Sequence, residues 1–131
     1  MGTVQTDGAS GLFIGGTSFL NSGLIDSSPS IPFFGLGSVA IVSDELNNLA
    51  SGEIKTNGGS LSFGDLVVQT AVTNAGSISA DGGGIIFASG TVDNFANGLI
   101  EISAGTITVA APVILVNDGT IASDGGSIAI A

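Results

Sequence analysis

Apolar residues recur along this chain with a long period, and three of their positions repeat in phase. The intervals between successive coils are 24, 22 and 21 residues. Self-similarity at about 20 to 25 residues is typical of a solenoid, in which each coil buries its apolar face only against its neighbours. The three columns are Ile54, Ile78, Ile100 and Ile121; Leu61, Ile85, Ile107 and Ile128; and Phe63, Phe87, Val109 and Ile130.

Residues 70–94 show the layout of one coil. They contain three short apolar segments, centred on Ile78, on residues 85–87 and on Val92, with turn residues between them. Asn74 and Gly76 precede the first segment, and the run 81–83 (Asp-Gly-Gly) follows it. Asn, Asp and Gly favour tight turns, so each coil is predicted to hold three short strands.

The other coils repeat this layout with decreasing clarity towards the amino terminus. The sequence predicts an all-β, single-domain parallel β-solenoid over residues 1–131, with about six coils and uncapped ends. The expected turn residues include Asn97 and Gly98, and Asn117 and Gly119. Upstream, the matching positions are Val4, Leu12, Ile14, Asn21, Gly23, Ile25, Ile31 and Phe33.

Residues 26–50 interrupt the rhythm and are predicted to hold an irregular insertion. The segment contains Pro29 and Pro32, and proline is tolerated only at the edges, starts or bulges of strands. It is either a loop insertion or an arm that packs on a neighbouring chain. Residues 43–46 (Ser-Asp-Glu-Leu) are expected to form a single helical turn there.

Composition supports strands and restricts the partners. The chain lacks Trp, Tyr, Cys and His and holds 22 glycines, so its core must consist of small and β-branched side chains with seven Phe. The chain has 11 acidic residues and one basic residue, Lys55, which gives a net charge of −10. Nucleic acid is therefore not an expected partner, because phosphate binding needs many Lys or Arg. No stretch has the roughly 20 apolar residues of a membrane span, so no membrane insertion is expected.

Two phrases resemble a known family: NAGSISADGGGIIF at 74–87 and NDGTIASDGGSIAIA at 117–131. Both are similar to repeats of filamentous haemagglutinin-type secreted bacterial β-helix proteins. The resemblance covers residues 52–131. It implies a right-handed β-solenoid located outside the cell or at the cell surface, in proteins that are usually far longer.

Candidate chemistry is sparse. The chain has no Arg and no His, and its one adjacent acidic pair, Asp44-Glu45, lies in the irregular segment. We therefore expect no enzymatic activity, no catalytic residue and no cofactor. The calcium-binding nonapeptide of β-rolls is also absent, because Leu61 and Phe63 stand where Gly and Asp would be needed.

A calcium ion is the candidate bridge wherever two acidic residues meet between stacked copies of the chain. Three residues beyond each first-strand anchor stand Asp7, Ser28, Asn57, Asp81, Ser103 and Asp124, so no two acids fall on adjacent coils. Carboxylates stacked about 4.8 Å apart would repel by about 1 kcal/mol in water. If Asp124 of one copy stacks over Asp7 of the next, a bridging cation such as calcium is expected at these two residues.

The open ends indicate the function. Solenoids normally need polar capping repeats, yet residues 127–131 still have the pattern of a core strand. We therefore expect a structural subunit whose partners are copies of itself, stacked head-to-tail into an extracellular bacterial filament. The alternative is a fragment of a long secreted adhesin that mediates surface attachment. The predicted assembly interface consists of Val4, Leu12, Ile14, Ile121, Ile128 and Ile130.

Overall fold

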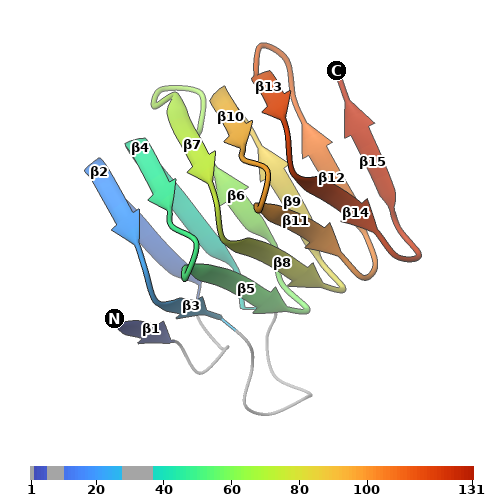
Figure 1. Cartoon of the computed structure of the whole chain (residues 1–131), viewed down its shortest axis with the longest axis horizontal. Coiled ribbons are helices and arrows are strands. Elements are labelled where there is room, and N and C mark those ends of the chain that lie inside the picture. The colour runs from blue at the N-terminus through green and yellow to red at the C-terminus, as the bar shows by residue number, and fades with distance from the viewer. Residues whose placement is uncertain (1, 6–10, 28–36) are drawn as a thin grey trace.

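The chain forms a stack of parallel strands. A computed structural model describes residues 2–5, 11–27 and 37–131, and every element within them is a β-strand. The strands stack as a β-solenoid of about five turns. Figure 1 shows the coils side by side, from β1 and β2 at one end to β14 and β15 at the other. The predicted all-β solenoid is confirmed, and the expected six coils are close to the observed number.

The strands of successive coils line up in three columns. The first column is a six-stranded sheet: β1 (Thr3–Gln5), β3 (Leu24–Asp26), β5 (Glu53–Asn57), β8 (Ser77–Asp81), β11 (Leu99–Ile102) and β14 (Thr120–Ser123). The second column holds the beginnings of β2 (Leu12–Asn21) and β4 (Val39–Asn48), then β6 (Leu61–Phe63), β9 (Gly84–Phe87), β12 (Thr106–Val109) and β15 (Ser127–Ile130). The third holds the ends of β2 and β4, then β7 (Thr70–Asn74), β10 (Gly90–Asn94) and β13 (Ile114–Asn117).

The strand register confirms the three apolar columns. Ile54 pairs with Ile78, which pairs in turn with Ile100, and Ile121 follows in β14. The columns that begin at Leu61 and Phe63 pair in the same way through to β15. Because side chains alternate across a strand, all members of a column point to the same interior.

The interior is built of stacked layers of aliphatic side chains. Ile54, Ile78 and Ile100 are 0% exposed, and Ile85 and Ile107 are also fully buried. The rings of Phe63 and Phe87 stack with centroids 5.0 Å apart and an interplanar angle of 15°. Burial of each large side chain stabilises the fold by about 1.5 to 3 kcal/mol.

The predicted insertion is partly wrong. Residues 39–48, expected to be irregular, form strand β4, and the helical turn expected at 43–46 is part of that strand. Val39 and Ile41 pair with Leu61 and Phe63, so they hold the positions that the sequence had assigned to Ile31 and Phe33. Residues 28–36, which include Ile31, Phe33 and the two prolines, lie outside the described residues.

A ladder of asparagine side chains runs along the solenoid at the ends of the third-column strands. The amide Nδ2 of each Asn donates to the Oδ1 of the Asn on the next coil, at 2.8 Å in all four steps. The inner three are at most 1% exposed. A buried amide needs partners for both its donor and its acceptor, and stacking supplies both. The ladder consists of Asn21, Asn48, Asn74, Asn94 and Asn117.

The ladder corrects one expected turn residue. Asn97 was predicted to be equivalent to Asn74, but it is exposed, and Asn94 holds the ladder position. The turns after Asn48 and Asn94 are longer than the turn after Asn74, and these two amides also donate to the carbonyls of Gly52 and Gly98, at 3.4 and 3.2 Å. The sequence indicated the turn but selected the wrong Asn within it.

The turns between the first and second strands need glycine for two different reasons. Gly82 has φ of +83°, the left-handed conformation that favours glycine. A Cβ on the next residue, Gly83, would lie 1.6 Å from the carbonyl oxygen of Gly59 in the coil below. The Gly-rich turn therefore provides both a left-handed backbone and close contact between coils.

Candidate functional site

The carboxyl-terminal edge of the solenoid is formed by β13, β14 and β15. Each of these strands pairs with the preceding coil along one edge. Along the other edge, no strand of the described part of the chain is paired with them. Open strand edges present unpaired N–H and C=O groups and are templates for pairing with another chain.

Apolar side chains are exposed across this end. Ile107 and Val109 of β12 are 0% and 1% exposed, whereas Ile128 and Ile130, the next members of their columns, are 42% and 64% exposed. Ile121 in β14 is half-buried. These side chains point towards the interior columns but have a coil on only one side, so the end presents an apolar cross-section of the core.

The asparagine ladder also reaches this edge. Asn94 donates from Nδ2 to the Oδ1 of Asn117 at 2.8 Å and to the carbonyl of Thr120 at 3.2 Å. The Nδ2 of Asn117 donates to the carbonyl of Gly119, two residues away, at 3.3 Å. The last ladder amide is exposed, and it donates within its own turn instead of to a further coil.

The amino-terminal end presents the complementary edge. β1 lies at the other end of the six-stranded sheet, and β2 pairs with β4. Val4 is 42% exposed, and Leu12 and Ile14 are half-buried. Val4, Leu12 and Ile14 are paired in register with Ile25, Val39 and Ile41, so they begin the same columns that Ile121, Ile128 and Ile130 end. The predicted interface residues thus lie at two opposite ends.

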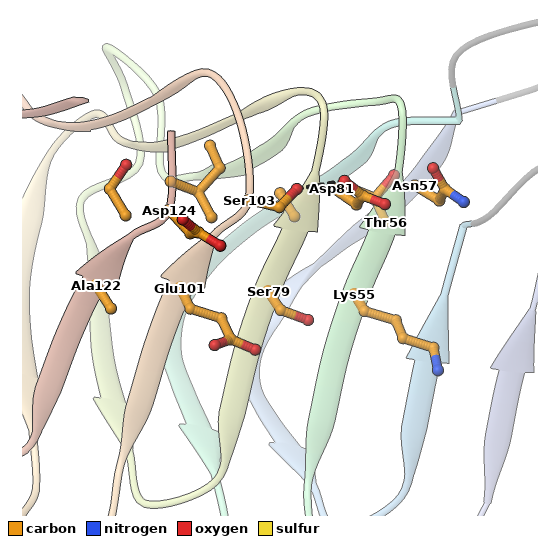
Figure 2. A pocket seen from close by; sticks show the side chains of 12 residues that line it. Lys55, Thr56, Asn57, Ser79, Asp81, Glu101, Ser103, Ala122 and Asp124 are labelled. Carbon is orange, nitrogen blue, oxygen red and sulfur yellow. Dashed lines mark hydrogen bonds between the residues drawn. The ribbon is translucent and has the colours of Figure 1, made fainter. Parts of the chain in front are cut away.

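A groove runs along the outer surface of the first-column sheet, across successive coils (Figure 2). One row of the groove's lining contains Lys55, Ser79, Glu101 and Ala122 (Figure 2). A second row contains Asn57, Asp81, Ser103 and Asp124.

The second row is the turn column expected from the sequence. Asn57 pairs in register with Asp81, and the hydroxyl of Ser103 hydrogen-bonds to the carboxylate Oδ1 of Asp81. Asp81 and Asp124 are therefore separated by a neutral residue on the coil between them. Asp7 and Ser28, the first two members of this column, lie outside the described residues.

The groove does not gather metal ligands. In the described ranges, no group of three or more His, Cys, Asp or Glu residues could hold a metal ion. Asp124, one of the two expected calcium ligands, is exposed at the groove's carboxyl-terminal end, and the other, Asp7, is not described. Lys55 lies 3.3 Å from Glu53 of its own strand.

A small loop joins β6 to β7 and carries two apolar side chains into solvent. Leu66 and Val67 are 103% and 87% exposed. The carboxylate of Asp65 accepts hydrogen bonds from the N–H groups of Val67 and Val68, both at 2.7 Å. These bonds lower the pKa of Asp65, and the bond from the Val68 N–H has the larger effect.

Comparison with known proteins does not place the chain in a family. No family model, curated protein or solved structure matches it. The part of the chain that the structure describes contains no helix long and apolar enough to span a membrane.

Sequence reasoning missed the ladder as a feature of the edge. A usable signal was present, because each ladder Asn follows an apolar residue two positions earlier. The five segments are Phe19-Leu20-Asn21, Leu46-Asn47-Asn48, Val72-Thr73-Asn74, Val92-Asp93-Asn94 and Leu115-Val116-Asn117. This apolar–x–Asn pattern marks every coil of the ladder, but Phe95-Ala96-Asn97 also fits it, so the pattern alone does not select Asn94 over Asn97.

Proposed function

We propose that this chain is a structural subunit that stacks head-to-tail on copies of itself to build a filament. The observation that carries the proposal is the match between the two ends: β14 and β15 end columns that β1 and β2 begin, with the same parallel polarity. A copy placed on the carboxyl-terminal edge would set Val4 on Ile121, Leu12 on Ile128 and Ile14 on Ile130. The extracellular location implied by the family resemblance belongs to the same proposal.

The energetics favour such a contact. Ile128 and Ile130 are 42% and 64% exposed, and full burial of a large aliphatic side chain stabilises by about 1.5 to 3 kcal/mol. Parallel backbone hydrogen bonds would continue from β14 to β1 and from β15 to the beginning of β2. A contact between two different ends of the same molecule is heterologous, and it generates an open filament wherever it does not close into a ring.

The test is assembly of the purified chain, followed by sedimentation velocity and negative-stain electron microscopy. We expect long fibres whose mass grows with protein concentration. The Ile128→Asp variant places a carboxylate in the contact and should abolish the fibres. Ile86→Asp is the matched control, because Ile86 is similarly exposed, at 39%, but lies on the outer surface of β9 in the middle of the solenoid.

Two other outcomes would decide against this function. Dispersed monomers at high concentration would contradict it and favour the adhesin alternative, in which neighbouring repeats of a longer β-helix cover the edge. Equal loss of fibres in Ile86→Asp and Ile128→Asp would show that assembly does not use the end contact.

Repeating the assay in EDTA tests the calcium bridge expected at Asp124, because fibres that form equally well without divalent cations need no bridge.

A further inference from the structure

Two asparagines of the chain are followed directly by glycine. They are Asn57 before Gly58 and Asn97 before Gly98, and both asparagines are exposed. Asparagine is a thermolabile residue, because the backbone nitrogen of the next residue can attack its side-chain amide. Glycine has no Cβ to hinder that attack. The ladder asparagines are engaged in hydrogen bonds and none is followed by glycine, so the two Asn-Gly sequences are the candidate sites of deamidation.

The attacking nitrogen of the second sequence is firmly held. The N–H of Gly98 donates to the carbonyl of Phe95 at 2.7 Å, and the carbonyl of Gly98 accepts from the Nδ2 of Asn94 at 3.2 Å. A Cβ on Gly98 would lie 2.3 Å from both the carbonyl oxygen of Asn74 and the Oδ1 of Asn94. Gly98 is thus packed against the ladder, and turning its nitrogen towards the Asn97 side chain would disrupt these contacts.

The attacking nitrogen of the first sequence is held at the end of a strand pair. Asn57 is the last residue of β5, and its register partner is Asp81, the last residue of β8. The N–H of Gly58 donates to the carbonyl of Asp81, and Gly58 has φ of +82°. Bonds at the end of an element open more readily than those inside it. Opening of this bond frees the nitrogen of Gly58 to approach the Asn57 side chain.

We propose that Asn57 is the site at which the folded chain deamidates spontaneously. The nitrogen of Gly58 forms a bond to the Cγ of Asn57, and the Nδ2 group leaves as ammonia with the proton that this nitrogen loses. Solvent water then opens the five-membered imide at one of its two carbonyls. One opening leaves aspartate at position 57, and the other leaves isoaspartate, in which the main chain runs through the side chain. The site lies on an inner coil, so the proposal is independent of the stacking of copies.

The product changes the spacing of carboxylates in the groove. Asp81 has neutral residues on both neighbouring coils, Asn57 and Ser103. A carboxylate at position 57 would stand directly opposite Asp81 in the strand pair, and like charges in that position are destabilising. Figure 2 shows the Lys55 side chain directed away from this row, and its Nζ lies 3.3 Å from Glu53. Deamidation therefore places two facing acids at the end of β5 and β8.

The test compares the two Asn-Gly sequences within one molecule, so each site is the control for the other. The purified chain is incubated at mildly alkaline pH, and conversion of each amide to acid is followed by peptide mapping with mass spectrometry. In the folded chain, we expect Asn57 to convert at least about fivefold faster than Asn97, which must also break the hydrogen bonds of its turn. In urea, where the fold no longer distinguishes the sites, the two rates should be similar.

Matched variants check the assignment through the ammonia that is released. Asn57→Gln should remove the fast phase of ammonia release from the folded chain, and Asn97→Gln should leave it unchanged. Equal rates at the two sites in the folded chain would overturn the proposal. Faster conversion of Asn97 or of a ladder asparagine would do the same.

A second measurement tests the effect on the groove. Asn57→Asp reproduces one product, and at low ionic strength its folding equilibrium constant should be about fivefold below that of the parent. Adding Asp81→Asn leaves one carboxylate in the pair, so the double variant should recover the loss. Salt should also restore the single variant, because exposed like charges are screened. A loss that persists both in salt and in the double variant would overturn the proposed repulsion between positions 57 and 81.

Discussion

Ile107 and Ile128 hold the same position in successive coils, yet their surroundings differ. Ile107 is 0% exposed and Ile128 is 42% exposed. The residue type and the pairing register are the same, so the difference comes from the presence of a coil on both sides or on one. In a solenoid, burial is a property of the neighbouring coils as much as of the residue. The inner coils are thus a core, and the last coil is a surface made of core residues.

The largest expected effect comes from placing a charge at each of these two positions. Ile107→Asp buries a carboxylate between two apolar layers and should lower the free energy of unfolding by about 4 kcal/mol. Ile128→Asp leaves its carboxylate in contact with water and should cost less than about 1 kcal/mol in the monomer. Urea unfolding followed by circular dichroism, at concentrations below assembly, measures both. Similar losses would contradict the coil register described here.

The ladder gives a second comparison between the inside and the edge. Asn74→Ala leaves the Nδ2 of Asn48 and the Oδ1 of Asn94 without their ladder partner in a buried site, and we expect a loss of about 3 kcal/mol. Asn117→Ala removes an exposed amide at the end of the ladder and should cost about 1 kcal/mol. Chemical unfolding of both variants checks the ratio.

The control for this pair is Asn97→Ala, which should change the free energy of unfolding by less than about 0.5 kcal/mol. A loss at Asn97 as large as the loss at Asn74 would show that the turn, and not the ladder, stabilises the third column.

The sequence predicted the apolar columns well because their chemistry repeats strictly. Isoleucine, leucine and phenylalanine mark each coil from Ile54 onwards, and the register places them as expected. It failed before Ile54, where Ile31 and Phe33 fit the spacing of the later coils better than Val39 and Ile41 do. Spacing cannot reveal how many residues a turn holds, so the longer connection hid β4.

The ladder was missed for a related reason. Asn97 stands directly before Gly98 and has the local signature of a turn, whereas Asn94 is separated from that glycine by three residues. Local turn chemistry favours Asn97. Only the need to satisfy a buried amide from two neighbouring coils selects Asn94, and that need concerns the stack instead of the single coil.

A smaller effect on the free energy of unfolding is expected when an exposed ion pair on the outer face of β5 is removed. Ile54 of β5 is fully buried, while its neighbour Lys55 is on the outer face with Glu53 at 3.3 Å. Exposed ion pairs contribute little, so Lys55→Gln should change the free energy of unfolding by less than about 0.5 kcal/mol. Thermal unfolding checks this. The sequence predicts no enzymatic activity, and a turnover that the parent chain shows and the Lys55→Gln variant loses would contradict that expectation.

The smallest expected effect is a pH-dependent change in the loop between β6 and β7, which should leave the flanking strands unchanged. The N–H groups of Val68 and Val67 lower the pKa of Asp65, so this carboxylate stabilises the loop at pH values above the ordinary pKa of Asp. As the pH falls below about 4 and through the lowered pKa, protonation removes the charge that these N–H groups bind, and the loop should loosen. The hydroxyl of Ser89, 2.7 Å from the carbonyl oxygen of Asp65, anchors the loop base independently of pH.

Amide shifts of Val67 and Val68 should therefore change in acid while those of Val72 in β7 stay constant. In Asp65→Asn the side-chain oxygen still accepts both bonds but does not titrate, so the acid-dependent shifts should disappear. Acid shifts that persist in this variant would assign the change to the solenoid itself and remove the distinction between the loop and its strands.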